Sequence, residues 1–176
     1  MVHHRKCEIA SRRRVIATRR VVAVATLIAS ALSAAPAIAT PATGFSSEQL
    51  AKGVYDAMHL TADKDSKWDL ILRTKDQSDV YVVRNTIAPG GQSGWHTHPG
   101  PSLITVTAGE ITVYESDGLC QPRVYGVGDG ALDLGSGHLH LIKNEGATNA
   151  VTVVVQIIPT GATRRIDADE PNNCNF

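Results

Sequence analysis

From Trp68 onward the chain consists of short β-rich runs separated by clusters of turn-forming residues. The runs cover residues 68–73, 80–87, 102–107, 111–114, 123–125, 138–143 and 151–158. Turn residues lie between them, as at Pro89-Gly90-Gly91, at the spacing typical of an all-β sandwich or barrel. No helix-length apolar period separates the runs, so alternating βαβ units are excluded. The sequence therefore predicts an all-β domain with antiparallel pairing.

Residues 1–39 have the composition of an export signal. Five arginines, at positions 12, 13, 14, 19 and 20, precede an apolar run over residues 21–32, and Ala37-Ile38-Ala39 offers a cleavage site. A retained membrane anchor is the alternative, but the apolar run is short for a bilayer span. The arginine pairs leave both the general secretory and the twin-arginine routes open. We expect a cleaved signal and a secreted or periplasmic protein.

Removal of this signal changes the charge of the chain. The mature protein of about 137 residues would hold 10 Lys and Arg residues against 16 Asp and Glu residues. No basic stripe remains to bind phosphates, so nucleic acid and anionic membranes are not expected as partners. The length suits one domain with a single core.

The remaining boundaries follow from local patterns. Residues 40–45 are expected to form a connector, and Ser46-Ser47-Glu48-Gln49 resembles a capping box that starts a short helix ending near Tyr55. We therefore expect a helical segment over residues 46–66, a barrel over residues 67–160 and a tail over residues 161–176.

Three histidines form a candidate metal site. His96 and His98 are two residues apart, and alternate side chains of a β-strand share a face. His140 lies in a later run, and a neighbouring strand would bring its imidazole to the same point. Such an arrangement can hold a divalent transition metal.

The same residues resemble the two motifs of the cupin superfamily. The matching positions are Gly90, His96, His98 and Gly109 in the first motif, and Gly137, His140 and Asn144 in the second. The resemblance implies a double-stranded β-helix, that is, a jelly-roll barrel, to which the short N-terminal helix would be added. It also implies a small-molecule ligand or substrate, and a homodimer as one plausible assembly. Asn144 is expected to hold a turn rather than to contact the ligand.

Two positions depart from the family pattern. Ser102, or Leu103 in the longer spacing, replaces the glutamate of the first motif, and Gly135 stands where proline is usual in the second. Without that carboxylate the site is neither a set of three histidines and one glutamate nor a face of two histidines and one carboxylate. Three imidazoles still suit Fe, Mn, Cu, Zn or Ni and leave positions open for water or substrate.

Other side chains near the triad are candidates for supporting roles. His138 and Ser102 are candidates for a fourth ligand or for a group that supports the ligands. The alternative for His138 is a hydrogen bond to the backbone or to water at the mouth of the strand. Glu110 and Tyr114 are candidate replacements for the missing catalytic base.

Cys120 and Cys174 are the two cysteines that remain after Cys7 leaves with the signal. In an oxidising compartment an even number of cysteines usually indicates a disulfide, which would tie the C-terminal tail back to the domain. Two free thiols, one of them a metal ligand, are the alternative.

These features support three hypotheses about function. The first is an exported, metal-dependent oxidoreductase of the dioxygenase type. The second is a non-catalytic domain that binds a metal or a small molecule. The third is a structural cupin with vestigial histidines.

Overall fold

The computed structural model describes residues 39–62, 68–117, 121–171 and 174. The chain divides into residues 1–35, which lie outside this description, and residues 36–176, which form the unit discussed below. Within the described residues the structure contains twelve strands and no helix. The strands are β1 (Thr43–Tyr55), β2 (His59–Thr61), β3 (Ile71–Arg73), β4 (Ser78–Gln92), β5 (His96–Thr97), β6 (Ser102–Ala108), β7 (Ile111–Glu115), β8 (Arg123–Tyr125), β9 (Gly130–Asp133), β10 (His140–Lys143), β11 (Ala150–Pro159) and β12 (Ile166–Asp167).

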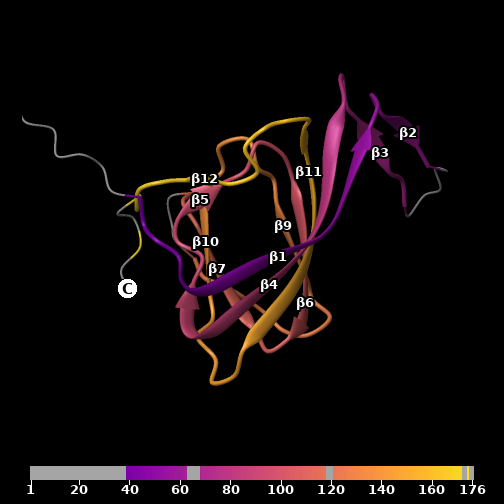
Figure 1. Ribbon diagram of the computed structural model, residues 1–176. Coiled ribbons are helices and arrows are strands. Elements are labelled where there is room, and N and C mark those ends of the chain that lie inside the picture. Colours follow the sequence, from indigo (N-terminus) through magenta and orange to yellow (C-terminus); the bar gives the residue numbers. More distant parts are fainter. Residues whose placement is uncertain (1–38, 63–67, 118–120, 172–173, 175–176) are drawn as a thin grey trace, which may run out of the picture. The chain divides into compact units, whose positions relative to one another are not determined.

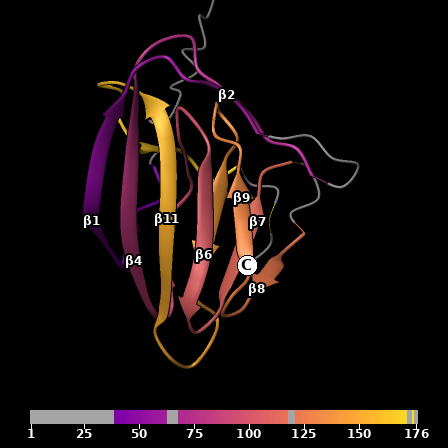
Figure 2. The ribbon, with the colours of Figure 1, turned by 90° about the vertical axis from the view of Figure 1, so that its right-hand side faces the viewer.

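Ten of these strands form one antiparallel sheet with two halves. One half has the order β1-β4-β11-β6-β9, which Figure 2 shows side by side, and the other has the order β12-β5-β10-β7-β8. The halves join where Lys143 of β10 pairs with Gln92 of β4. Figure 1 shows the two halves facing each other as a nearly closed barrel. The predicted all-β jelly roll is thereby confirmed.

The core of the barrel follows the two-residue period of its strands. Along β11 and β6 buried and more exposed positions alternate, as expected when one face of a sheet points inward. The buried side chains of one cluster are Val83, Ile87, Ile104, Val106, Ile111, Val113, Ala131, Ile142, Ala150 and Val154. Burial of this apolar surface is the main force that holds the barrel together.

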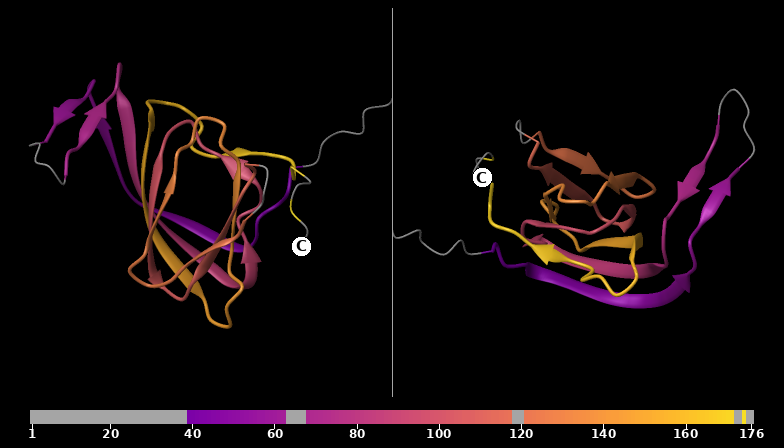
Figure 3. Two further views of the ribbon diagram at one scale, coloured as in Figure 1. Left: turned by 180° about the vertical axis from the view of Figure 1, so that it is seen from behind. Right: turned by 90° about the horizontal axis from the view of Figure 1, so that it is seen from above.

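The predicted helix over residues 46–55 is wrong, because this segment is strand β1. β1 pairs along β4 with two irregularities, between Thr43 and Phe45 and between Gln49 and Ala51. Glu48 lies opposite Arg84, with an Oε2 to Nη1 distance of 3.2 Å. Most side chains of β1 are exposed. A capping box is a weak local signal, and here the backbone hydrogen bonds to the edge of β4 outweigh it. Farther along the expected helical segment, β2 pairs with β3 in a hairpin that extends away from the barrel (Figure 3).

Two sequence predictions fall partly outside the described residues. Residues 1–38 of the expected export signal are not described, and no helix of the described residues is long and apolar enough to cross a membrane. Cys120 is also outside the description, so its pairing with Cys174 stays a prediction. Cys174 is buried and packs with Trp95, Tyr114 and Leu141.

Candidate metal centre

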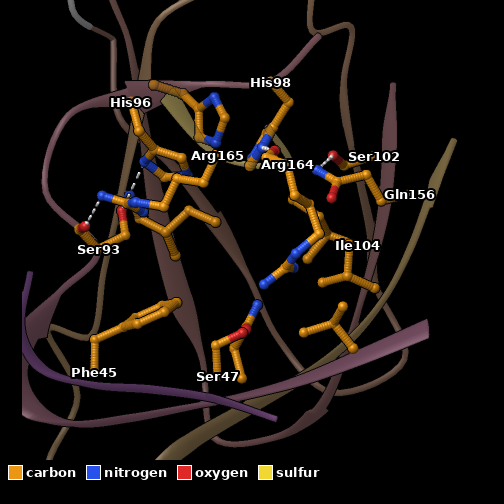
Figure 4. A pocket seen from close by; sticks show the side chains of 15 residues that line it. Phe45, Ser47, Ser93, His96, His98, Ser102, Ile104, Gln156, Arg164 and Arg165 are labelled. Carbon is orange, nitrogen blue, oxygen red and sulfur yellow. Dashed lines mark hydrogen bonds between the residues drawn. The ribbon is translucent and has the colours of Figure 1, made fainter. Parts of the chain in front are cut away.

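The three histidines chosen from the sequence lie together inside the barrel. β5 pairs antiparallel with β10, which places His96 opposite His140, and His98 follows just after β5. The ring centroids are 4.3 Å apart for His96 and His140, 4.9 Å for His96 and His98, and 5.4 Å for His98 and His140. One nitrogen from each ring lies within 4.8 Å of the others. Figure 4 shows His96 and His98 at one end of a pocket.

Backbone carbonyls fix the orientation of two of these rings. The Nδ1–H of His96 donates to the carbonyl oxygen of Gly94 at 2.8 Å, and the Nδ1–H of His98 donates to that of Arg164 at 2.7 Å. A carbonyl only accepts hydrogen bonds, so in both neutral rings Nε2 keeps its lone pair. Both ring nitrogens of His140 are buried without a hydrogen-bond partner among the described residues. Each ring therefore has a nitrogen available to a metal ion.

Burial keeps these rings neutral. His96 is 4% exposed, His140 is 2% exposed, and the side chain of His98 is 11% exposed. Burial, together with the nearby charges of His140 and Arg165, lowers the pKa of His96 from 6.5 to about 2. Burial lowers the pKa of His140 to about 4, against the opposing effect of Asp133, and it also lowers the pKa of His98. Neutral imidazole is the form that binds metal, so protons compete weakly for this site.

Ser102 lines the same pocket, where the family pattern has glutamate. On β6 it pairs with Gln156 of β11, whose Nε2 donates to the Ser102 hydroxyl oxygen at 3.1 Å. The other amide atom, Gln156 Oε1, is buried without a hydrogen-bond partner among the described residues. The position of the expected glutamate is thus occupied by a neutral hydroxyl and amide pair.

A carboxylate that sequence reasoning missed lies beside the histidines. Asp133, on β9, is 5% exposed. Its Oδ1 is 3.5 Å from His140 Nδ1, and its Oδ2 is 4.0 Å from His98 Nε2. Asp133 thus places a carboxylate beside the histidines, although the departure at Ser102 led us to expect none there. No motif spacing marks Asp133, because its place depends on the pairing of β9 with β6.

His138 faces Asp133 and is not a member of the three-histidine group. Its Nδ1 is 3.7 Å from Asp133 Oδ1, and Asp133, His138 and His140 form a second group of candidate ligand atoms within 4.8 Å of one another. The His138 side chain is partly exposed. It therefore neighbours the site through the carboxylate.

Neither suggested replacement for the catalytic base lines this pocket. Glu110 is exposed between β6 and β7. Tyr114 donates its hydroxyl hydrogen to Glu145 Oε1 at 2.9 Å, and burial together with this bond raises the pKa of Tyr114 to about 12. Both residues are therefore poorly placed to take a proton from a ligand at the histidines.

The pocket beside the histidines has an apolar wall and a charged mouth. Phe45, Val83, Ile104 and Val154 supply apolar surface. The space open to a water-sized molecule is about 80 Å³. A cavity of this size holds several water molecules and therefore suits a small ligand.

Two arginines from the C-terminal segment also line the pocket (Figure 4). The guanidinium of Arg165 is held by Asp167 Oδ1 and the Ser93 carbonyl oxygen, each at 2.6 Å. The guanidinium carbon of Arg164 lies 5.7 Å from the centre of the Tyr81 ring, and no carboxylate of the described residues pairs with it. Arg164 is thus a cation at the pocket without an anionic partner in the described part of the chain.

The second departure from the family pattern has a conformational reason. Gly135 has a φ of +66°, which proline cannot adopt, since its ring fixes φ near −65°. A β-carbon at this position would also collide with the carbonyl oxygen of Gly100. Gly135 therefore allows the turn between β9 and β10 to pass close to the chain after His98.

A family model described as "Cupin domain" matches residues 83–156. The chain contains a cupin domain. This segment runs from β4 into β11 and includes the three histidines and Asp133, so the cupin resemblance of the two sequence motifs is confirmed. The N-terminal edge strand and the arginines of the C-terminal segment lie outside the matched residues of the cupin domain.

Several solved structures are similar to this cupin domain. A conserved protein with a double-stranded β-helix domain from Klebsiella pneumoniae is 24% identical, covers 65% of this chain and 86% of its own, and has a TM-score of 0.42. The polyketide cyclase of Streptomyces resistomycificus is 15% identical over 53% of this chain and 63% of its own, with a TM-score of 0.44. A recombinant oxalate oxidase in complex with glycolate is 30% identical over 44% of this chain and 41% of its own, with a TM-score of 0.39. At these TM-scores the likenesses carry no argument about function. No curated protein sequence matches the chain.

Proposed function

We propose that this cupin domain binds one divalent transition metal ion through His96, His98 and His140. The observation that carries the proposal is the convergence of three buried, neutral imidazoles, two of them oriented by backbone carbonyls. Hydrogen bonds of this kind set the tautomer and the direction of the remaining lone pair. Imidazole nitrogens suit Fe, Mn, Cu, Zn and Ni, and the donor set by itself does not choose among them.

We further propose that the ligand of the pocket is a small anion. The Arg164 guanidinium, which forms no ion pair with any described residue, supports this, because a cation at a narrow pocket favours a carboxylate or a similar oxyanion. The Asn85 side chain also lines the pocket and adds an amide N–H that can donate a hydrogen bond to such an anion. The apolar wall formed by Phe45, Val83 and Val154 excludes water from its other side.

Such a site supports oxidoreductase chemistry of the dioxygenase type on that molecule. When bound, Fe, Mn or Cu would supply Lewis acidity and a redox centre. The chain itself would position the anion through Arg164 and keep the histidines unprotonated. A non-catalytic binding domain is the second candidate. It is favoured because, among the described residues, only Asp133 and the histidines could act as a base near the pocket.

We propose that the protein acts outside the cytoplasm, either as a monomer or as a homodimer. Its support is the arginine-rich segment followed by an apolar run and Ala37-Ile38-Ala39. In that compartment a disulfide between Cys120 and Cys174 would hold the tail against the cluster that contains Trp95.

Elemental analysis of the protein purified from its native compartment tests the metal site. We expect one equivalent of the same metal in the wild type and in the exposed control His59→Ala, and almost none in His96→Ala and His140→Ala. Equal metal content in all four proteins would reject the site. With the metal identified, oxygen consumption in the presence of small carboxylates separates the two functions, since a binding domain takes up the anion without consuming oxygen.

A further inference from the structure

We propose that Asp133 supplies the carboxylate that the first cupin motif lacks, so that three histidines and one aspartate hold the metal ion. The inference rests on the proposed metal site and adds a ligand to it. It assigns a role to a residue that lies outside both sequence motifs.

The sheet register places Asp133 where it can do this. β9 pairs with β6 so that Asp133 lies opposite Ser102, and β6 pairs with β11 so that Ser102 lies opposite Gln156. Residues that lie opposite each other in an antiparallel sheet have side chains on the same face. Adjacent strands are about 4.8 Å apart, so a carboxylate on β9 lies one strand away from the position of the missing glutamate. There Asp133 lines a second, smaller cavity, which shares Ile104 and His140 with the histidine pocket.

The two oxygens of Asp133 have different surroundings. Oδ1 accepts a hydrogen bond from the backbone N–H of Gly135 at 3.0 Å, and this bond fixes the side chain. Oδ2 is 4.0 Å from His98 Nε2, the nitrogen that the Arg164 carbonyl leaves available. Ligands of one ion are separated by distances of about 3–4 Å, so Oδ2 and His98 Nε2 can share an ion.

The burial of this carboxylate also points to a cation. Oδ2 has no hydrogen-bond partner in the described part of the chain, and no Lys or Arg there forms an ion pair with Asp133. An isolated buried carboxylate is strongly unfavourable unless a cation or hydrogen bonds compensate it. A divalent ion between Oδ2 and the three imidazoles would be such a cation.

An aspartate ligand would change the character of the site. It would reduce the charge of a divalent centre from two to one. Carboxylate oxygen also favours Mn²⁺ and Fe²⁺ more than an all-imidazole set does. The ligand chemistry would then equal that of the family pattern, with the acidic group moved to the next strand.

The test removes the carboxylate from position 133, on β9, and introduces one at position 102, on β6. We would measure the Co²⁺ affinity by competition with a chelator and record the visible absorption spectrum, which reports the ligand number. The proteins are the wild type, Asp133→Ser, Asp133→Asn, Ser102→Glu/Asp133→Ser and His96→Ala. Glu115→Gln is the matched control, because Glu115 lies opposite His140 on β7 and its loss removes one negative charge near the site.

We expect Asp133→Ser to weaken Co²⁺ binding by about 100-fold or more and to change the spectrum, since loss of even an outer partner costs 10–100-fold. The double variant should recover to within about tenfold of the wild type, and Glu115→Gln should change affinity by less than about threefold. Circular dichroism of the metal-free proteins checks folding, and the isosteric Asp133→Asn decides the test if Asp133→Ser does not fold.

Three results overturn the inference. Wild-type affinity and spectrum in Asp133→Asn would show that Asp133 is not a ligand while the histidine site stands. The same conclusion follows if Asp133→Ser binds weakly with an unchanged spectrum and the double variant does not recover. If His96→Ala binds Co²⁺ as the wild type does, the histidine site is itself absent and both proposals fail.

Discussion

His140 lies directly opposite His96 in the antiparallel pair of β10 and β5, with their ring centroids 4.3 Å apart. Backbone hydrogen bonds between two strands therefore set this distance before any metal arrives. His98 is held from a third direction by the Arg164 carbonyl. A site prepared in this way loses little conformational entropy when it takes up an ion.

Metal removal should lower the melting temperature in a histidine-dependent way. At an ion concentration 100 times Kd, binding to the native state alone adds about 2.7 kcal/mol to the free energy of unfolding. We expect a loss of several degrees when a chelator is added to the wild type and to His59→Ala. His96→Ala should melt at the same temperature with and without chelator. An unchanged melting temperature in the wild type would favour the structural cupin with vestigial histidines.

The metal-free protein should lose stability as the pH falls below 6.5. The pKa values of His96, about 2, and His140, about 4, lie below the ordinary value of 6.5, so the unfolded chain takes up protons first. The stability that depends on the neutral rings is complete above pH 6.5 and declines toward pH 4, by about 1.4 kcal/mol per pH unit and per ring. Urea unfolding between about pH 7.5 and pH 4.5 measures this slope. His140→Gln should reduce the slope and His59→Gln should not; equal slopes would contradict the burial of a neutral His140.

Arg164→Gln should weaken anion binding in the pocket. A charge-assisted hydrogen bond contributes about 1.5–3 kcal/mol, so we expect the affinity of the metal-loaded protein for malonate to fall about tenfold or more. Isothermal titration calorimetry provides the measurement. Arg84→Gln is a matched control, since Arg84 is an exposed arginine that pairs with Glu48. Equal malonate affinity in Arg164→Gln and Arg84→Gln would exclude Arg164 as the anchor.

Asn144→Ala should destabilise the fold without changing the ligand set. Asn144 is fully buried, and its Nδ2 donates to the carbonyl oxygens of Ile87 and Thr148, each at 2.8 Å. Its Oδ1 accepts from the Gly146 N–H at 3.0 Å. Loss of these three bonds should lower the free energy of unfolding by about 2–4 kcal/mol, measured by urea unfolding. Asn149→Ala, an exposed neighbour in the same turn, should have little effect, and a similar loss in both variants would contradict the role of Asn144.

The sequence identified the parts of this molecule that depend on local pattern. The runs predicted over residues 80–87, 102–107 and 151–158 lie within β4, β6 and β11, because long strands with one buried face show a two-residue period. The histidines were found because their spacing is a property of single strands. Asn144 holds its turn as expected.

The features that were missed depend on pairing between distant segments. β1 looked helical because its start resembles a capping box, while its stability as a strand comes from pairing with β4, between residues 23 to 49 positions apart in the sequence. β9 has only four residues, and Asp133 lies near the site because the pairing of β9 with β6 places it opposite Ser102. Likewise, the link between His98 and the Arg164 carbonyl spans 66 residues. No local pattern encodes these contacts.

The use of the Arg164 carbonyl to orient His98 also affects the order of events during synthesis. β12 pairs with β5, and its partners include the backbone of His96 and Thr97. The ribosome must therefore release the chain to beyond Arg164 before the His98 ring is oriented. The proposed ion would then be captured late in the maturation of this polypeptide, and a chain that stops before Arg164 would pair His96 with His140 but lack the carbonyl that orients His98.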